Sequence, residues 1–173
     1  LFAPNFHPAF KRIMPIRKEL GARTLFNLMG PLLNPARPTH QLLGVPTAGF
    51  VPLIAEALAL TGVKRAAVVH GAGGFDELSP FGPAEGVWIR DGWTRRETLG
   101  PQTVGIPRHK LSEVAVASRD EAVQVLLELL EGHGPEAMKD MLALNLGACL
   151  HLLEDGLTLK QGVEKARAAV TAG

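Results

Sequence analysis

A strand–helix–strand pattern in the first half of the chain is the feature that most constrains its fold. Gln41–Val45 and Arg65–His70 are short apolar runs with the length of strands, and glycines follow the second run directly. Between them, Thr47 is placed to cap a helix over Ala48–Thr61. Strands joined by a helical crossover pair in parallel within one sheet. The sequence therefore predicts an α/β fold with a central sheet flanked by helices.

The rest of the chain predicts a hairpin followed by helices. Asp91-Gly92 separates two β-prone runs, Gly86–Ile89 and Thr94–Leu99, which is the pattern of a tight β-hairpin. Gly100–Val116 contains prolines and shows no regular periodicity. Three helical patterns, each with a start signal at its first residue, then close the chain: Ser118–Leu130, Pro135–Leu153 and Thr158–Ala172.

Composition narrows the classes of protein to which the chain can belong. Its 173 residues carry 18 Lys and Arg against 17 Asp and Glu, so the basic excess typical of nucleic-acid binders is missing. No apolar run approaches the roughly 18 residues that span a bilayer, and no secretory signal is present, so we expect a cytoplasmic protein without a membrane partner. The single cysteine, Cys149, is expected to be a buried, unreactive thiol. Because the sequence begins at Leu1 without an initiator methionine, we expect it to be the interior of a longer protein.

Residues 7–35 (HPAFKRIMPIRKELGARTLFNLMGPLLNP) contain an unusual density of special residues. A helix that begins at Pro8 and ends at Gly21 is predicted, with a kink or break at Pro15. By helical phase, Arg17 lies at the margin of the apolar stripe, where its guanidinium could hold a planar carboxylate through two hydrogen bonds. A surface arginine with a partly buried stem is the alternative.

Two further residues of this stretch are candidate pocket-lining groups. His7 could contact a ligand, or it could cap the following helix or be a hydrogen-bonded polar residue without a ligand. Gly30-Pro31 fixes a turn at the end of a helix predicted over Arg23–Leu33. Pro31 offers a flat apolar face to an aromatic ring, and a rigid structural connection is the alternative.

Asp76 and Glu77 are the candidate metal ligands. They follow the strand Arg65–His70 and its glycines, and α/β sheets bind their ligands beyond the carboxyl ends of the strands. Two carboxylates beside a phosphorylated substrate suit Mg²⁺, which takes one or two carboxylates together with phosphate and water. The glycines do not form a Walker loop, since no Gly-Lys-Ser/Thr follows them. A solvated acidic turn is the alternative.

In this order, these segments resemble the anthranilate phosphoribosyltransferases. The resemblance rests on the string His-Pro-Ala…Arg-Lys-Glu-Leu-Gly…Arg-Thr…Phe-Asn…Gly-Pro-Leu…Asn-Pro in residues 7–35 and on Asp-Glu-Leu-Ser-Pro at residues 76–80, which matches the family's metal-binding loop. It covers essentially the whole chain and weakens after Gly100. It implies the α/β domain of the nucleoside phosphorylase and phosphoribosyltransferase type, of which residues 1–173 would be the C-terminal portion.

The resemblance also implies an activity and a set of site residues. Members of this family transfer the phosphoribosyl group of phosphoribosyl pyrophosphate (PRPP) to the amine of anthranilate, release pyrophosphate, and form homodimers. Arg17 would hold the anthranilate carboxylate, and His7 and Pro31 would line the anthranilate site. Asp76 and Glu77 would bind Mg²⁺. No catalytic base is expected, because the amine is already a nucleophile that needs mainly to be positioned.

The sequence departs from the family in two respects. The family's glycine-rich PRPP loop (Gly-Thr-Gly-Gly-Asp), its Lys-His-Gly segment and its helical domain are absent from the 173 residues, so we expect little or no turnover from this chain alone. Residues 117–120 and Asn145–Ala148 differ from the usual family residues, which we interpret as packing variation. A pyrimidine nucleoside phosphorylase, which shares the fold, and a non-catalytic relative that binds nucleic acid are the alternative interpretations.

Overall fold

The computed structural model of the chain describes residues 6–7, 12–13, 15–16, 19, 21 and 29–173. The chain divides into two compact units, Leu1–Pro38 and Thr39–Gly173. In the first unit, Gly30 precedes a short 3₁₀ helix, η1 (Pro31–Leu33). Of the kinked helix predicted between Pro8 and Gly21, residues 12–13, 15–16 and 19 are helical and Gly21 is not. The other residues of that prediction, and residues 23–28 of the helix predicted over 23–33, fall outside the described residues.

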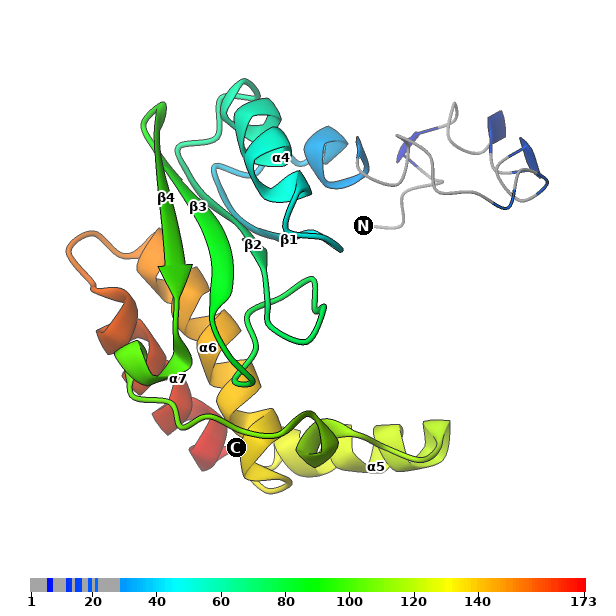
Figure 1. Cartoon of the computed structure of the whole chain (residues 1–173), viewed down its shortest axis with the longest axis vertical. Coiled ribbons are helices and arrows are strands. Elements are labelled where there is room, and N and C mark those ends of the chain that lie inside the picture. The colour runs from blue at the N-terminus through cyan, green and yellow to red at the C-terminus, as the bar shows by residue number, and fades with distance from the viewer. Residues whose placement is uncertain (1–5, 8–11, 14, 17–18, 20, 22–28) are drawn as a thin grey trace. The chain divides into compact units, whose positions relative to one another are not determined.

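A four-stranded sheet forms the centre of the second unit (Figure 1). Its strands, in order across the sheet, are β1 (His40–Gly44), β2 (Arg65–His70), β3 (Ala84–Arg90) and β4 (Trp93–Leu99). β1 and β2 are parallel and are connected through α4 (Phe50–Ala59), whereas β3 is antiparallel to both of its neighbours. The predicted parallel β-α-β unit and α/β fold are thereby confirmed.

The predicted hairpin is the pair β3–β4. Asp91 and Gly92 at its turn have φ values of 47° and 84°. Two successive residues in the left-handed region define a type I′ turn, whose twist matches that of the flanking strands. The strands are longer than predicted, because Ala84 already pairs with Leu99 across the ladder.

The helices begin close to the predicted start signals, with one exception. Ser118 caps α5 (Arg119–Leu130) by accepting a hydrogen bond from the amide of Glu121, and Thr158 caps α7 (Leu159–Ala172) in a capping box with Gln161. Pro135 precedes α6 (Glu136–Leu153). The prediction that Thr47 caps the first crossover helix is wrong: α4 begins only at Phe50, after Gly49, and the cap makes no side-chain hydrogen bond. Two 3₁₀ helices, η2 (Pro101–Val104) and η3 (Leu111–Val114), lie in the segment predicted to be irregular.

Helices cover β2 from both sides, so its central residues are fully buried. α4 contacts β2 and β3 with the face that carries Val51, Ile54, Ala55 and Leu58, the spacing of an amphipathic helix. α6 contacts β1 and β2 on the other side, where Ala67 and Val69 join Leu144, Ala148 and Val163 in one apolar cluster. Successive strand residues point to opposite faces, which explains why an uninterrupted apolar run is needed in β2.

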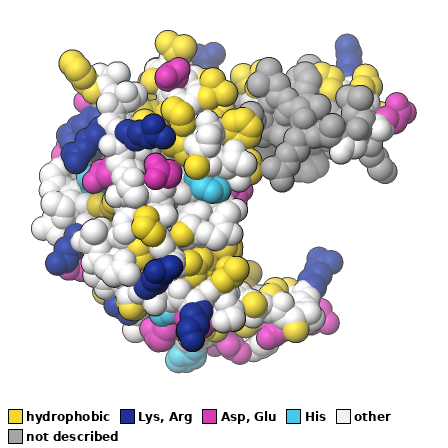
Figure 2. Space-filling view, in the orientation of Figure 1, with side chains coloured by type: hydrophobic (Ala, Val, Ile, Leu, Met, Phe, Trp, Pro, Cys, Tyr) yellow, Lys and Arg dark blue, Asp and Glu magenta, His cyan; other side chains and the backbone are white. Residues whose placement is uncertain are grey.

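The three helices at the end of the chain differ in how they pack. α6 and α7 cross at two glycines: a Cβ on Gly147 would lie 2.5 Å from the Cα of Val163, and one on Gly162 would lie 2.5 Å from the carbonyl oxygen of Gly147. In contrast, α5 has no buried residue. Figure 2 shows hydrophobic side chains at the surface over α5, which lies at the lower right of Figure 1. None of the helices in the described part of the chain combines the length and apolarity needed to cross a membrane.

Candidate functional site

The acidic pair lies on a loop that follows β2 at the edge where β1 also ends. Because β1 and β2 are parallel, their carboxyl ends meet at this edge. The amide of Val45 donates to the carbonyl of Val69 at 2.9 Å, so the ladder continues one residue beyond β1. The Nδ1 atom of His70 lies 2.9 Å from the carbonyl oxygen of Val45. A carbonyl can only accept, so Nδ1 carries the proton, and this bond joins the two strand ends next to the loop.

Two glycines let the acidic loop (residues 71–82) cross directly over these strand ends. A Cβ on Gly44 would lie 1.4 Å from the carbonyl oxygen of Asp76, and a Cβ on Gly71 would lie 2.0 Å from that of Glu77. Any side chain at either position would therefore occupy the space of the loop backbone. Gly44 and Gly71 thus set how closely Asp76 and Glu77 approach the sheet.

Hydrogen bonds within the loop fix its shape. The amide of Gly71 donates to the carbonyl of Phe75 at 2.8 Å, and the hydroxyl of Ser79 donates to the carbonyl of Ala72 at 2.7 Å. Gly73 and Gly74 have φ values of 85° and 83°, a conformation that other residues rarely adopt. These bonds and glycine conformations give the backbone of the loop a defined shape.

Asn145 of α6 holds the loop from the side of the core. Its Oδ1 accepts from the amide of Leu78 at 2.9 Å, and its Nδ2 donates to the carbonyl of Leu78 at 2.8 Å and to that of Met141 at 2.9 Å. Leu78 directly follows Glu77, so this side chain fixes the backbone beside the acidic pair. The sequence analysis interpreted the region of Asn145 as packing variation and missed this role. The signal was an amide side chain between the buried Leu144 and Ala148.

The two carboxylates share an exposed site whose electrostatics favour a cation. Asp76 and Glu77 are both exposed at the surface. Partial burial of its carboxyl, and then the neighbouring charge of Asp76, raise the pKa of Glu77. A cation beside these carboxylates would favour the ionised form of Glu77.

This donor set fits Mg²⁺ and does not fit a metal that needs a protein cage. Within the described residues, no group of three or more His, Cys, Asp or Glu side chains could hold an ion. Mg²⁺ requires fewer protein ligands, since it keeps several waters and is commonly bound by one or two carboxylates plus substrate phosphate. Asp76 and Glu77 could hold Mg²⁺ in this way.

The predicted anthranilate-site residues belong to the first unit. His7 is half-buried, and Pro31 is exposed at the first position of η1. Arg17 lies outside the described residues. Their roles in binding anthranilate stay predictions.

Cys149 is half-buried in α6, where full burial was predicted. Burial raises the pKa of its thiol. The raised pKa keeps the sulfur protonated at neutral pH, as expected for an unreactive cysteine.

The match to known proteins covers the whole sequence. The sequence model of the family described as "Glycosyl transferase family, a/b domain" matches residues 1–173, so the chain belongs to this family. Among curated proteins, it is similar to the anthranilate phosphoribosyltransferases of Nitratidesulfovibrio vulgaris and Oleidesulfovibrio alaskensis, with 58% and 50% identity over 100% of the chain. These alignments cover 53% and 52% of the two relatives, so the chain spans about half the length of the curated relatives it matches.

Solved structures of anthranilate phosphoribosyltransferases are also similar to the chain. Anthranilate phosphoribosyltransferase from Thermus thermophilus superposes with a TM-score of 0.85 and 36% identity, over 96% of this chain and 49% of that one. The Saccharomyces cerevisiae enzyme in complex with PRPP and Mg superposes with a TM-score of 0.81 and 30% identity, over 95% of this chain and 47% of that one. The same yeast enzyme in complex with 4-fluoroanthranilate has a TM-score of 0.84 and 30% identity, over 98% and 49%. The resemblance and the fold predicted from the sequence are confirmed.

Proposed function

We propose that the chain is part of an anthranilate phosphoribosyltransferase of tryptophan synthesis. This enzyme would transfer the phosphoribosyl group of PRPP to the amine of anthranilate and release pyrophosphate. The observation that carries the proposal is the 58% identity to a curated anthranilate phosphoribosyltransferase over the whole chain. The acidic loop supports it independently, because its two exposed carboxylates suit Mg²⁺ beside a phosphorylated substrate.

Within this reaction, residues 1–173 would supply the metal-binding loop and the anthranilate pocket. Asp76 and Glu77 would hold Mg²⁺, which when bound neutralises charge on the leaving pyrophosphate. Arg17 would bind the anthranilate carboxylate through its two-pronged guanidinium, with His7 and Pro31 lining the ring. The attacking amine needs orientation more than activation, so no residue of the chain is assigned as a base.

Three further features belong to the proposal. The chain would be the C-terminal portion of the catalytic α/β domain, and the full-length enzyme would be a cytoplasmic homodimer. PRPP binding would need the glycine-rich loop that the 173 residues do not contain. The purified 173-residue chain should therefore show little or no turnover with anthranilate and PRPP.

The proposal is tested in the full-length protein by following the loss of anthranilate fluorescence. Asp76→Asn and Glu77→Gln should each lower kcat/KM by about 100-fold or more, because metal stabilisation of developing charge is worth several kcal/mol. Both should weaken Mn²⁺ binding measured by electron paramagnetic resonance. Asp91→Asn is the matched control, since this exposed turn residue keeps its left-handed backbone as Asn.

A second variant tests the anthranilate pocket. Arg17→Lys keeps the charge but loses the planar pair of donors, so it should raise the KM for anthranilate and leave the KM for PRPP unchanged. Wild-type activity in both acidic-loop variants, or turnover of thymidine and phosphate in place of PRPP and anthranilate, would contradict the proposed function.

A further inference from the structure

Residues 108 and 109 pass behind the acidic loop and bind its backbone. The amide of His109 donates to the carbonyl of Pro80 at 2.9 Å, and the Nε atom of Arg108 donates to the carbonyl of Phe81 at 2.8 Å. Pro80 and Phe81 follow Asp76-Glu77 by only a few residues. An interaction that holds residues 108 and 109 in place therefore also restrains the C-terminal end of the acidic loop at Pro80 and Phe81.

The imidazole of His109 is held between two carboxylates. Its Nε2 lies 2.8 Å from Oδ2 of Asp140 on α6, and its Nδ1 lies 3.0 Å from Oε2 of Glu113 on η3. An ionised carboxylate only accepts hydrogen bonds, and a neutral imidazole carries a single N–H. Both contacts are hydrogen bonds only when the ring is doubly protonated. The neutral ring would leave one nitrogen lone pair facing a carboxylate.

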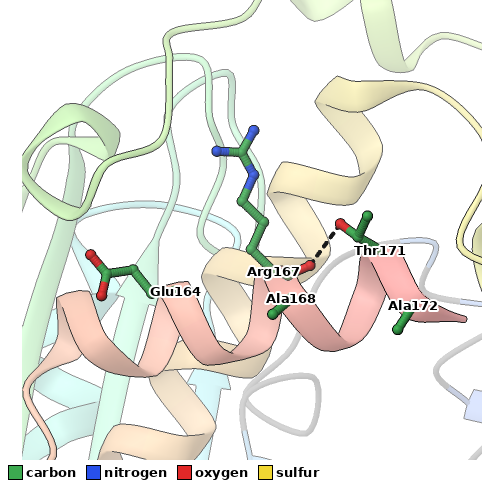
Figure 3. Close-up of a pocket in the computed structure, with 5 residues that line it drawn as sticks. All are labelled: Glu164, Arg167, Ala168, Thr171 and Ala172. Atoms are coloured by element: carbon green, nitrogen blue, oxygen red, sulfur yellow. Dashed lines mark hydrogen bonds between the residues drawn. The ribbon is translucent and has the colours of Figure 1, made fainter.

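The buried carboxylate of Asp140 adds to the need for this positive charge. Asp140 has 0% of its surface exposed, and its Oδ1 lies 2.9 Å from the Nε atom of Arg167 without hydrogen-bond geometry. Figure 3 shows the Arg167 side chain extending away from α7, next to Thr171, whose hydroxyl donates to the Arg167 carbonyl. A buried charge that loses a partner is costly, because water cannot replace the lost bond.

No other charged group described near the ring takes over the role of the positive charge on His109. Glu136 and Lys139 of α6 form an ion pair with each other, and Glu136 also interacts with both His109 and Arg167. On α7, Arg167 is the cation that faces Asp140. Lys110 is adjacent in sequence, and its backbone amide binds the same Glu113. His109 is therefore the group at this junction whose charge can change near neutral pH.

We propose that His109 is a positioning residue that holds the acidic loop in place only while its ring is doubly protonated, joining η3, α6 and α7 behind Asp76 and Glu77. This inference rests on the proposed function for its consequence, which is that deprotonation loosens the metal-binding loop and weakens metal binding. The cysteine of α6, the shallow hollow along α7 lined by Glu164 and Ala168, and the exposed face of α5 offer no comparable arrangement of groups.

The direction of the pH dependence follows from the surroundings of the ring. Burial opposes the charge, but the hydrogen bonds that the ring donates to Asp140 and Glu113, together with their negative charges, outweigh it and raise the pKa of His109. A group with a raised pKa in the folded state stabilises that state fully below its unfolded pKa, about 6.5 for histidine. The stabilisation is lost as the pH rises through the higher folded pKa. Loop protection should therefore be greatest below pH 6.5 and fall as the pH rises through the raised pKa of His109.

Hydrogen–deuterium exchange of the metal-free protein tests the inference without using the reaction. Protection factors, corrected for intrinsic rates, are measured for peptides covering residues 76–82 and 105–112 across the titration of the His109 ring followed by NMR. In the wild type we expect protection to fall roughly three- to tenfold as the ring loses its proton, the worth of one or two hydrogen bonds. His109→Gln should remove this step and keep the low protection at every pH. His133→Gln, at an exposed histidine in the α5–α6 connection, is the matched control and should keep the step.

Glu113→Gln provides a second test that leaves the hydrophobic core unchanged. This exposed side chain contributes to the raised pKa of His109, so its neutral replacement should move the step to lower pH without abolishing it. Loop protection that stays constant through the His109 titration, or a step that persists in His109→Gln, would overturn the inference.

Mn²⁺ binding to the same proteins separates this inference from the proposed function. Weaker Mn²⁺ binding in His109→Gln, and in the wild type at pH values where the His109 ring has lost its proton, supports both. A pH-dependent loop that binds no Mn²⁺ at any pH leaves the positioning role standing and contradicts the metal site.

Discussion

The acidic loop and helix α5 show opposite relations between regularity and packing. The loop has no regular secondary structure over most of its length, yet it contacts two strand ends and is bonded to Asn145 and to residues 108–109. α5 is a regular, properly capped helix with no buried residue. Its Val123, Leu126, Leu127 and Leu130 are each at least half exposed.

This difference shows that a segment can have a regular local conformation without being stabilised by contacts with the rest of the fold, and the reverse. A cap and a helical sequence suffice to predict where α5 begins, but helices draw most of their stability from packing of an apolar face. The loop draws its stability from glycine contacts and from bonds to distant residues. Changes in the loop should therefore cost more free energy of unfolding than changes in α5.

The largest effect is expected from Gly44→Ala. The new methyl group would collide with the carbonyl of Asp76, a backbone atom that cannot move without displacing the loop. We expect the free energy of unfolding, measured by urea denaturation, to fall by about 3 kcal/mol, the upper range for overpacking. Gly49→Ala is the control, because nothing lies within 4 Å of its Cβ and its φ of −62° suits alanine. Equal stability of the two variants would show that the loop does not depend on this contact.

A smaller loss is expected from Asn145→Ala. This change leaves the amide and the carbonyl of Leu78 without their partner, and each unsatisfied buried group costs about 1 kcal/mol or more. We expect a loss of about 2 kcal/mol in the free energy of unfolding, together with faster hydrogen exchange at Leu78. Gln124→Ala on α5 removes only an exposed side-chain bond to Glu128 and should cost a few tenths of a kcal/mol.

Truncation on α5 should cost little. Leu126→Ala removes a side chain that is 54% exposed, so we expect a change below about 1 kcal/mol in the free energy of unfolding. The same truncation at Leu58, which is 1% exposed on α4, should cost about 3 kcal/mol because it leaves a cavity. If the two truncations cost the same, α5 is packed in solution and the comparison between the loop and α5 fails.

The smallest effect is the dependence of stability on pH at the acidic pair. Because the pKa of Glu77 is raised by burial and by Asp76, its contribution to stability is present below its unfolded pKa and is lost as the pH rises through its folded pKa. Asp76→Asn removes part of the cause, so without metal it should raise stability at neutral pH by a few tenths of a kcal/mol, as is typical of exposed charge pairs. Thermal unfolding at several pH values measures this. If Asp76 and Glu77 are the Mg²⁺ ligands, saturating Mg²⁺ should reverse the order, because it would then stabilise the wild type more than the variant.

Sequence reasoning found the local elements and missed the contacts that join them. The type I′ turn at Asp91-Gly92 and the caps at Ser118 and Thr158 depend on neighbouring residues, so they could be predicted. The cap at Thr47 was wrong, since the chain turns for two more residues before α4 begins.

The candidate site was predictable only in part, because some of its contacts join residues that are far apart in the sequence. The acidic pair and its place after a buried strand could be recognised from neighbouring residues. In contrast, Asn145 is 67 residues away from Leu78, and His109 is 31 residues away from Asp140. No local pattern encodes such pairs, because they form only when the sheet and α6 are packed together.

The close crossing of α6 and α7 has a mechanical consequence. Because α6 and α7 are in backbone contact at Gly147 and Gly162, a shift of one helix along the other would bring side chains into this contact, and we expect the two helices to move together as a rigid pair. Asn145 connects α6 to the acidic loop, and α6 in turn packs against α7. A cation that tightens the loop should therefore slow amide exchange along α7, although no residue of α7 is among the proposed metal ligands.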